Sequence, residues 1–426
     1  MVRLAGVVRL ESCARPALSP RGTEKGWGRM SKHRPWRAIA AAATLVTGLT
    51  ISAGTATAAS GWTIQNTPSP GVSTVDGVAC PAANACVAVG DGSSQAEAWN
   101  GTTWTLEPVP IPAGAGGIEL TGVACTSVDA CTAVGYSARP FNTSTLVEAW
   151  NGTSWSIQSS PNPGGPGNDA ELTGVSCTSA SSCVAVGFYH PAVGPATDAL
   201  AEVWDGSSWK IRQAVTPSGA TYVALDGVSC TSTSNCIAVG SQDGSTLAER
   251  WDGKSWSMQS TASAPGIGND GTLSSVDCTS ANNCMAVGDV NGLGITLAET
   301  WNGTSWAISP TPNPVVATNP PGGSTSTLNS VSCASASSCT AVGYYTSNGG
   351  NPGTSSNSAF TLIEAWNGAA WTIQPSPNAA SAEASLLQGV SCSSASTCTA
   401  VGVDYTDPSP PNTPGSPRSG LVESES

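Results

Sequence analysis

Cysteine is the residue type whose spacing allows the clearest chemistry. The chain of 426 residues contains 15 cysteines, and 14 of them form pairs separated by five residues. The pairs are Cys80/Cys86, Cys125/Cys131, Cys177/Cys183, Cys230/Cys236, Cys278/Cys284, Cys333/Cys339 and Cys392/Cys398. An even number of paired cysteines is typical of disulfides in exported proteins, so we predict seven local disulfides. Zinc binding is the alternative, and it requires two pairs to converge or histidine to assist.

Acid–base and nucleophilic chemistry has few candidate residues. His190 is the one histidine after residue 58, which is too few for a copper site, and no G-x-S-x-G motif accompanies it. A glutamate recurs at similar spacing: Glu97, Glu148, Glu202, Glu249, Glu299, Glu364 and Glu423. Glycoside hydrolysis needs two carboxylates within about 10 Å, but these glutamates belong to different repeats. We interpret them as structural acceptors for an indole N–H or a backbone amide, and we predict no catalytic residue and no metal ligand.

The remaining candidates are aromatic residues in segments that vary between repeats. We predict ligand binding for Tyr136, Phe141, Tyr189, His190, Tyr222, Tyr344, Tyr345, Phe360 and Tyr405. Aromatic and polar side chains on loops of a rigid scaffold suit a carbohydrate or a peptide. Two alternatives remain open: these segments are solvated linkers, or the recurring tryptophan pairs, which we interpret as packing residues, stack on sugars.

The elements that position these residues repeat along the chain. Successive first cysteines lie 45 to 59 residues apart, and one copy reads LTGVSCTSASSCVAVG (172–187), a variable loop, then ALAEVWDGSSWKIRQ (199–213). Each copy contains four strand-like pieces, and the Asp-Gly or Asn-Gly dipeptide between the last two is a strong hairpin signal. Periods near 50 residues are typical of solenoids and propellers. The second-to-third loops and the connections between copies share one side, which we call the variable-loop face.

Seven such copies predict an all-β, seven-bladed β-propeller of four-stranded antiparallel blades. The last copy lacks a fourth strand, whereas GWTIQNTPSP (61–70) matches that strand and precedes the first copy. We therefore predict that the N-terminal strand closes the last blade; a C-terminally truncated sequence is the alternative. The predicted blades span residues 75–107, 121–158, 172–213, 225–259, 273–309, 328–374 and 386–423 plus 62–65.

The segment CTAVGYY…LIEAWNGAAWTIQ (339–374) resembles kelch-type propellers such as the central domain of galactose oxidase. In that family a second strand ends in glycine, and an acidic residue and an aromatic residue precede a turn, with a tryptophan on the last strand. The resemblance covers residues 62–423 and implies the architecture rather than one function. The sequence departs from the family where a single glycine (Gly135, Gly187, Gly240) replaces a doubled one.

Residues 1–58 are predicted to be a leader with a secretory signal peptide. A basic stretch (30–37), an apolar run (38–54) and ATA (56–58) follow in the order of such a signal, with Met30 as the candidate start. An anchored N-terminal helix is the alternative. Residues 59–426 are then a single β-propeller domain. Nine of the 15 cations and two of the 28 acids precede residue 59, which leaves six cations against 26 acids and excludes a basic nucleic-acid footprint.

These patterns predict a secreted, extracellular and monomeric binding or scaffold module without catalytic activity. Its expected ligand is a glycan or an extracellular protein bound through the variable-loop face, with no cofactor, no nucleic acid and no membrane span in the mature chain. The alternative is an extracellular carbohydrate-active enzyme, a lyase or hydrolase, that uses carboxylates on the same face.

Overall fold

The computed structural model describes residues 61–68, 72–92, 96–140, 142–163, 168–191, 196–262, 270–290, 293–314, 325–347, 358–380, 382–406 and 418–425. All of them belong to the second of two units into which the chain divides, Ala58–Ser426. The predicted leader, residues 1–58, lies outside the described residues. The described part contains 28 β-strands, and none of its residues belongs to a helix that could span a membrane.

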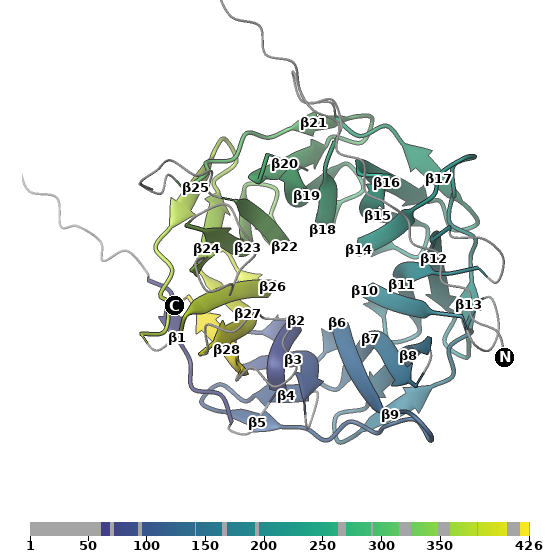
Figure 1. Cartoon of the computed structure of the whole chain (residues 1–426), viewed down its shortest axis with the longest axis horizontal. Helices are drawn as coiled ribbons and strands as arrows, with labels where there is room; N and C mark the ends of the chain where they lie inside the picture. Colours follow the sequence, from purple (N-terminus) through teal and green to yellow (C-terminus); the bar gives the residue numbers. More distant parts are fainter. Residues whose placement is uncertain are drawn as a thin grey trace, which may run out of the picture. The chain divides into compact units, whose positions relative to one another are not determined.

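The strands occupy four successive positions outward from a central channel (Figure 1). The innermost strands line that channel. They are β2 (Val72–Ala82), β6 (Gly117–Ser127), β10 (Ala170–Ser179), β14 (Val223–Ser232), β18 (Thr272–Ser280), β22 (Ser326–Ser335) and β26 (Ala384–Ser394). The second strands are β3 (Ala85–Gly92), β7 (Ala130–Arg139), β11 (Ser182–Tyr189), β15 (Asn235–Gln242), β19 (Asn283–Val290), β23 (Ser338–Thr346) and β27 (Thr397–Tyr405).

The two outer positions complete each set of four strands. The third strands are β4 (Ala96–Trp99), β8 (Asn142–Trp150), β12 (Asp198–Trp204), β16 (Ser245–Trp251), β20 (Ile295–Trp301), β24 (Ala359–Trp366) and β28 (Arg418–Ser424). The outermost strands are short: β1 (Thr63–Ile64), β5 (Trp104–Leu106), β9 (Trp155–Gln158), β13 (Trp209–Ile211), β17 (Trp256–Gln259), β21 (Trp306–Ile308) and β25 (Trp371–Gln374).

The prediction of seven separate four-stranded blades is wrong. The structure has five four-stranded blades, β2–β5, β6–β9, β10–β13, β14–β17 and β18–β21. The other eight strands form one sheet in the order β22, β23, β24, β26, β27, β28, β1, with β25 paired to β24. A parallel bridge between Ala359 and Ala384 joins β24 to β26 and merges the last two predicted blades. Hairpin signals locate strands within one repeat, but they carry no information about a bridge between two repeats.

The N-terminal strand pairs with the last strand, as the sequence predicts. Thr63 lies opposite Ser424 and Ile64 opposite Glu423 in an antiparallel register. The Gln65 amide donates to the Val422 carbonyl (2.8 Å), and its side-chain nitrogen donates to Ser424 Oγ (2.8 Å). The innermost strands β2 and β26 are also in contact, so the β2–β5 blade meets the eight-stranded sheet and closes the arrangement.

The seven predicted disulfides are confirmed, and each joins an innermost strand to the second strand of the same repeat. The third strand lies in register with the same hairpin, because Cys183 faces Trp204 and Trp204 faces Trp209. The disulfides and the tryptophan pairs therefore lie at one end of every sheet that has them. We call this end the hairpin face, and the opposite end is the variable-loop face.

The two cysteines of a pair differ in burial, although nothing in their spacing distinguishes them. The first cysteine, on the innermost strand, is half-buried in every pair. The second is 1–4% exposed and belongs to a hydrophobic core cluster, which holds for Cys86, Cys131, Cys183, Cys236, Cys284, Cys339 and Cys398. The reason is that the second strand lies between two others and packs against a neighbouring sheet. The second cysteine of each pair is therefore a core packing residue as well as a disulfide partner.

The glycine that ends CVAVG is required by a close approach of two strands. A Cβ atom on Gly187 would lie 2.0 Å from the Glu171 carbonyl oxygen, and the pairing of β10 with β11 shifts register beside it, between Leu172 and Gly174. In the next hairpin, Gly152 adopts a φ of 90°, and the Asn151 side chain accepts a bond from the Ser154 amide (3.0 Å). Positive φ of this kind explains the Asn-Gly turn.

The tryptophan pairs pack at the contacts between neighbouring sheets. Trp155 is 6% exposed and packs with Val89 and Ala96 of the preceding blade. Four first tryptophans, Trp150, Trp251, Trp301 and Trp366, donate to the disulfide hairpin of their own sheet, as Trp150 does to the Val128 carbonyl (3.2 Å). Two second tryptophans donate to the preceding sheet, Trp209 to Gln158 Oε1 (2.7 Å) and Trp371 to Ser309 Oγ (3.1 Å), whereas the buried Nε1 atoms of Trp256 and Trp306 have no partner in the described part of the chain. These contacts support the interpretation of the tryptophans as packing residues.

The seven recurring glutamates are buried on the third strands. Among the described residues, the segment that leaves the preceding sheet donates to four of them: Ser160 Oγ to Glu202 (2.9 Å), the Val215 amide to Glu249 (3.0 Å), the Ala262 amide to Glu299 (2.9 Å) and Ser376 Oγ to Glu423 (3.2 Å). Two of these donors are backbone amides, as predicted, and the other two are hydroxyl groups. No described indole N–H donates to these glutamates.

Candidate functional site

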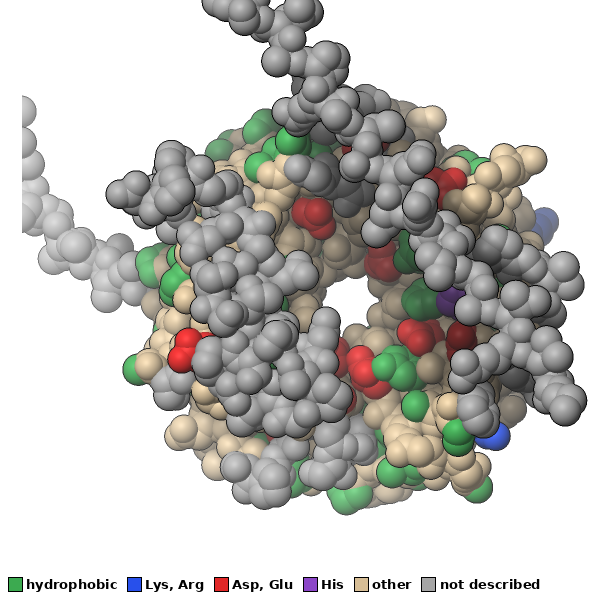
Figure 2. Space-filling view, in the orientation of Figure 1, with side chains coloured by type: hydrophobic (Ala, Val, Ile, Leu, Met, Phe, Trp, Pro, Cys, Tyr) green, Lys and Arg blue, Asp and Glu red, His purple; other side chains and the backbone are tan. Residues whose placement is uncertain are grey.

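The strongest candidate site is the central channel and its opening on the variable-loop face. The innermost strands enclose a cavity of about 350 Å³, which continues into a mouth of about 480 Å³. The mouth is lined by Asp76, Glu119, Tyr222 and Asp226. They lie on the innermost strands β2, β6 and β14 or, for Tyr222, directly before β14. On the face shown in Figure 2, acidic side chains gather around the central opening.

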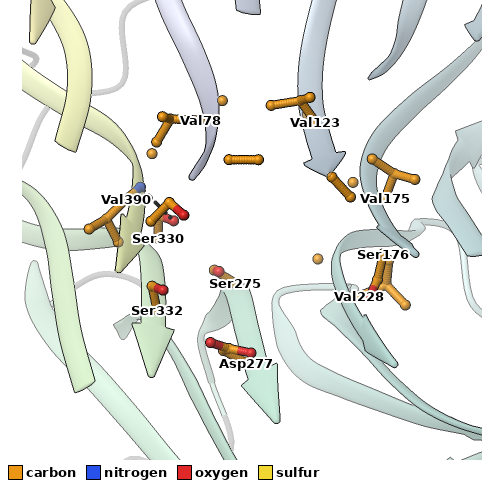
Figure 3. Close-up of a pocket in the computed structure, with 18 of the residues that line it drawn as sticks. Val78, Val123, Val175, Ser176, Val228, Ser275, Asp277, Ser330, Ser332 and Val390 are labelled. Atoms are coloured by element: carbon orange, nitrogen blue, oxygen red, sulfur yellow. Dashed lines mark hydrogen bonds between the residues drawn. The ribbon is translucent and has the colours of Figure 1, made fainter. Parts of the chain in front are cut away.

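Neighbouring sheets are tied together along the channel by short polar side chains. Ser176 Oγ accepts the Cys230 amide (3.0 Å), Asp277 accepts the Cys333 amide (2.7 Å), and Ser332 accepts the Cys392 amide (3.0 Å). Figure 3 shows Ser275, Ser330 and Asp277 around the channel, and Ser330 accepts the Val390 amide (3.2 Å). The middle of the channel wall is thus a structural hydrogen-bond network.

Nearer the mouth, one position on each innermost strand is polar. Thr121 donates to the Leu172 carbonyl and Thr173 to the Leu225 carbonyl, both at 2.7 Å and both across a contact between sheets. Asp76 and Asp226 occupy the same position on β2 and β14. An ionised carboxylate cannot donate in this way, and neither aspartate has a hydrogen-bond partner among the residues that the structure describes.

Burial shifts the titration of both aspartates. Desolvation, followed by repulsion from Glu119 and Asp91, raises the pKa of Asp76 to about 8, although Arg418 opposes this shift. Desolvation raises the pKa of Asp226 to about 7. Asp76 Oδ2 is buried. Two carboxyl groups that lack partners and titrate near neutral pH therefore line the opening, and such shifts are common at functional sites.

The structure distributes the predicted aromatic residues over several places. Tyr222 is exposed at the mouth, and the Tyr136 hydroxyl donates to Glu119, which also lines the mouth. Tyr405 lies near Asp76 and under Arg418, whose guanidinium carbon is 5.4 Å from the ring centre. These three tyrosines belong to the surroundings of the opening.

The other predicted residues lie elsewhere. Tyr344 packs with Tyr405 around the same buried cluster, while Tyr345 stacks on Phe360 at 5.3 Å between ring centres. Tyr189 packs at the contact with the preceding blade, and His190 meets Phe188 edge to face at 6.1 Å. Phe141 lies outside the described residues. The eight described residues do not form one site, and ligand binding by any of the nine stays a prediction.

The acidic residues of the mouth were missed in the sequence, although a signal was present. Asp76, Thr121, Thr173, Asp226, Ser274, Asn329 and Gln388 all stand two residues before the recurring valine. A position that is polar in every copy of the innermost strand indicates contact with a polar or solvated space. In the structure this space is the channel. Among the residues that the structure describes, no group of three or more His, Cys, Asp or Glu is placed to hold a metal ion.

Comparisons with known proteins identify the fold. No protein-family profile and no curated protein matches the chain. The WD40 β-propeller domain of Doa1 is 12% identical over 86% of this chain and 97% of that one, with a TM-score of 0.52. YCF48 bound to a peptide is 12% identical over 86% and 95% (TM-score 0.48), and a GH74 xyloglucanase from Xanthomonas campestris is 12% identical over 84% and 55% (TM-score 0.48). The chain therefore has a β-propeller fold, and its kelch resemblance stays a prediction.

Proposed function

We propose that the protein is a secreted, non-catalytic binding module whose channel mouth takes a cationic group of an extracellular protein partner. The observation that carries this proposal is the pair of partnerless carboxyl groups, Asp76 and Asp226, at an opening that Glu119 and Tyr222 also line. A lysine ammonium or arginine guanidinium would supply the donors that these oxygens lack. The Tyr222 ring offers a cation–π contact at the rim.

The disulfides agree with the extracellular part of this proposal. Seven disulfides within the described residues are typical of proteins from oxidising compartments. The excess of acidic residues over cations after residue 58 would also attract a cationic partner and steer its approach.

Binding of trilysine, measured by calorimetry, tests the role of the mouth. The unmodified protein should bind trilysine better at pH 9 than at pH 6, because carboxyl groups with pKa values near 8 and 7 are neutral below and charged above these values. Lysine stays mostly charged over this range, since its ordinary pKa is about 10.4. The double variant D76N/D226N should lose the interaction at pH 9.

The matched control is D205N/D252N, which removes the same charge from the hairpin face. Asp205 and Asp252 stand at turn positions where other copies have asparagine, such as Asn151 and Asn302, so the turns are expected to stay intact. The control variant should bind trilysine like the unmodified protein. Equal weakening of binding in both double variants would mean that total charge, and not the mouth, attracts the peptide, and the proposal would fail.

One observation favours a second candidate, the carbohydrate-active hydrolase. Asp76 is protonated at neutral pH and interacts electrostatically with Glu119, and a protonated acid beside a second carboxyl group is the arrangement that glycoside hydrolysis uses. Release of reducing ends from soluble polysaccharides, absent in D76N, would establish this activity. A protein that binds trilysine and releases no reducing ends supports the binding module instead.

A further inference from the structure

A second cavity lies on the hairpin face, where the eight-stranded sheet meets the β2–β5 blade. Its volume is about 290 Å³, close to the lower end of small-ligand pockets, which is about 300 Å³. Trp99 and Trp104 of the β2–β5 blade form one wall. Gln65, Thr399, Ser424 and Glu425 of the eight-stranded sheet contribute to the other. We call this cavity the seam pocket.

The neighbouring contact, between the β2–β5 and β6–β9 blades, shows why the seam pocket is open. The equivalent cavity there measures about 150 Å³ and lies between Trp150 and Trp155 on one side and Val87, Ala98 and Trp99 on the other. The volume at the seam is about twice as large in a molecule built from similar repeats. Both walls differ: Ala83 stands at the seam where Val128 lines the equivalent cavity, and the residues of the eight-stranded sheet also differ.

On the side of the eight-stranded sheet, one residue departs from the repeat. In the other third strands that end in tryptophan, this tryptophan pairs with the second cysteine of the disulfide, as Trp99 does with Cys86. In the eight-stranded sheet the Glu425 amide donates to the Cys398 carbonyl (3.0 Å), so Glu425 occupies this tryptophan position. A smaller, charged side chain in the place of an indole enlarges the cavity.

Two further departures from the repeat change the chemistry of this wall. Register pairs Val87 with Ala98 in the β2–β5 blade and Thr399 with Ser424 at the seam, so two apolar residues are replaced by two hydroxyl groups. Gln65 Nε2 donates to Ser424 Oγ (2.8 Å) and to Thr63 Oγ1 (3.1 Å), which fixes the orientation of this amide. Hydroxyl, amide and carboxylate groups thus face an aromatic wall.

We propose that the seam pocket binds a hexopyranose residue of a glycan. The sugar would place its C–H face on Trp99, the more exposed member of a pair whose ring centres are 5.7 Å apart and tilted by 38°. Its hydroxyl groups would bond to Glu425, Ser424 and Gln65. A purely aromatic occupant would match the tryptophan wall, but it would replace water against the polar wall with carbon, which is costly in a buried site. This site shares no residue with the channel mouth.

Tryptophan fluorescence during titration with methyl glycosides of glucose, galactose, mannose, fucose and N-acetylglucosamine tests the proposal. At least one glycoside should shift the emission, because Trp99 lies in the pocket wall. The variant E425W restores the repeat and fills the pocket, so it should keep the fold and lose the shift. The variant E425Q keeps the size of the side chain and removes its charge, and it should weaken binding by about tenfold, the loss expected of a charged hydrogen bond.

Two controls separate this site from the mouth and from an aromatic occupant. D76N/D226N should bind the glycoside unchanged, so failure of the proposed function at the mouth would leave this result intact. Free indole serves as the competing probe. A shift with indole and none with any glycoside would overturn the proposal, and so would glycoside binding that persists in both E425W and E425Q.

Discussion

At the scale of single residues, the recurring glutamates differ in hydrogen bonding: the carboxyl group has a donor among the described residues in some copies and none in others. Glu148 and Glu364 are fully buried, and none of their carboxyl oxygens has a partner in the described part of the chain. The segment that leaves the preceding sheet supplies a hydroxyl or an amide to Glu202 and Glu249. For Glu148, the corresponding residues are Val109 and Pro110, which offer neither donor.

The variant E148Q is expected to stabilise the fold, and more so as the pH rises. Desolvation raises the pKa of Glu148 from 4.5 to about 8. A carboxyl group whose pKa is raised in the folded state destabilises the fold progressively above its unfolded pKa, and this penalty stops growing above pH 8. The gain should be near zero at pH 4 and on the order of 1–3 kcal/mol at pH 8.

Urea denaturation at pH 4, 6 and 8 measures this gain. E299Q is the matched control, because Glu299 accepts the Ala262 amide and its pKa is raised less, to about 7, so its replacement should gain less at pH 8. A pH-independent difference between E148Q and the unmodified protein would contradict a raised pKa at Glu148.

At the scale of strands, the hairpins depend on a few residues with strict steric requirements. The glycine at the end of CVAVG lets the second strand approach the backbone of the innermost strand at a shift in register. The variant G187A should destabilise the protein by roughly 1–3 kcal/mol, as overpacking does. G117A is its control, because a Cβ atom on Gly117 would meet nothing within 4 Å. Similar midpoints of thermal unfolding for the two variants would refute the close approach.

The elements were largely predictable because their signals are local. Asn-Gly turns and five-residue cysteine spacing specify hairpins within one repeat, so the strands and the disulfides follow from the sequence. The bridge from Ala359 to Ala384 joins two repeats and has no local signal, which is why the number of separate blades was wrong. Asp76 and Asp226 were missed for a related reason, since their environment exists only when all innermost strands surround one channel.

At the scale of the whole molecule, closure depends on a two-residue strand and one buried side chain. Trp62 is 6% exposed and packs with Ile363 and Leu387 of the eight-stranded sheet. The variant W62A should lower the free energy of unfolding by about 3–5 kcal/mol, the usual cost of removing a buried indole. I64A is the control, because Ile64 is 41% exposed. Equal denaturation midpoints for W62A and the unmodified protein would show that closure does not rely on this strand.

The position of the disulfides gives the two faces different dependence on the redox environment. Every described cystine lies at the hairpin face, next to the tryptophans and the seam pocket, whereas the acidic mouth is held by hydrogen bonds and apolar packing. A reducing agent would therefore cut covalent links on one side of the molecule only. In a compartment whose redox potential changes, the protein would adjust the rigidity of one surface while the chemistry of the other stays the same.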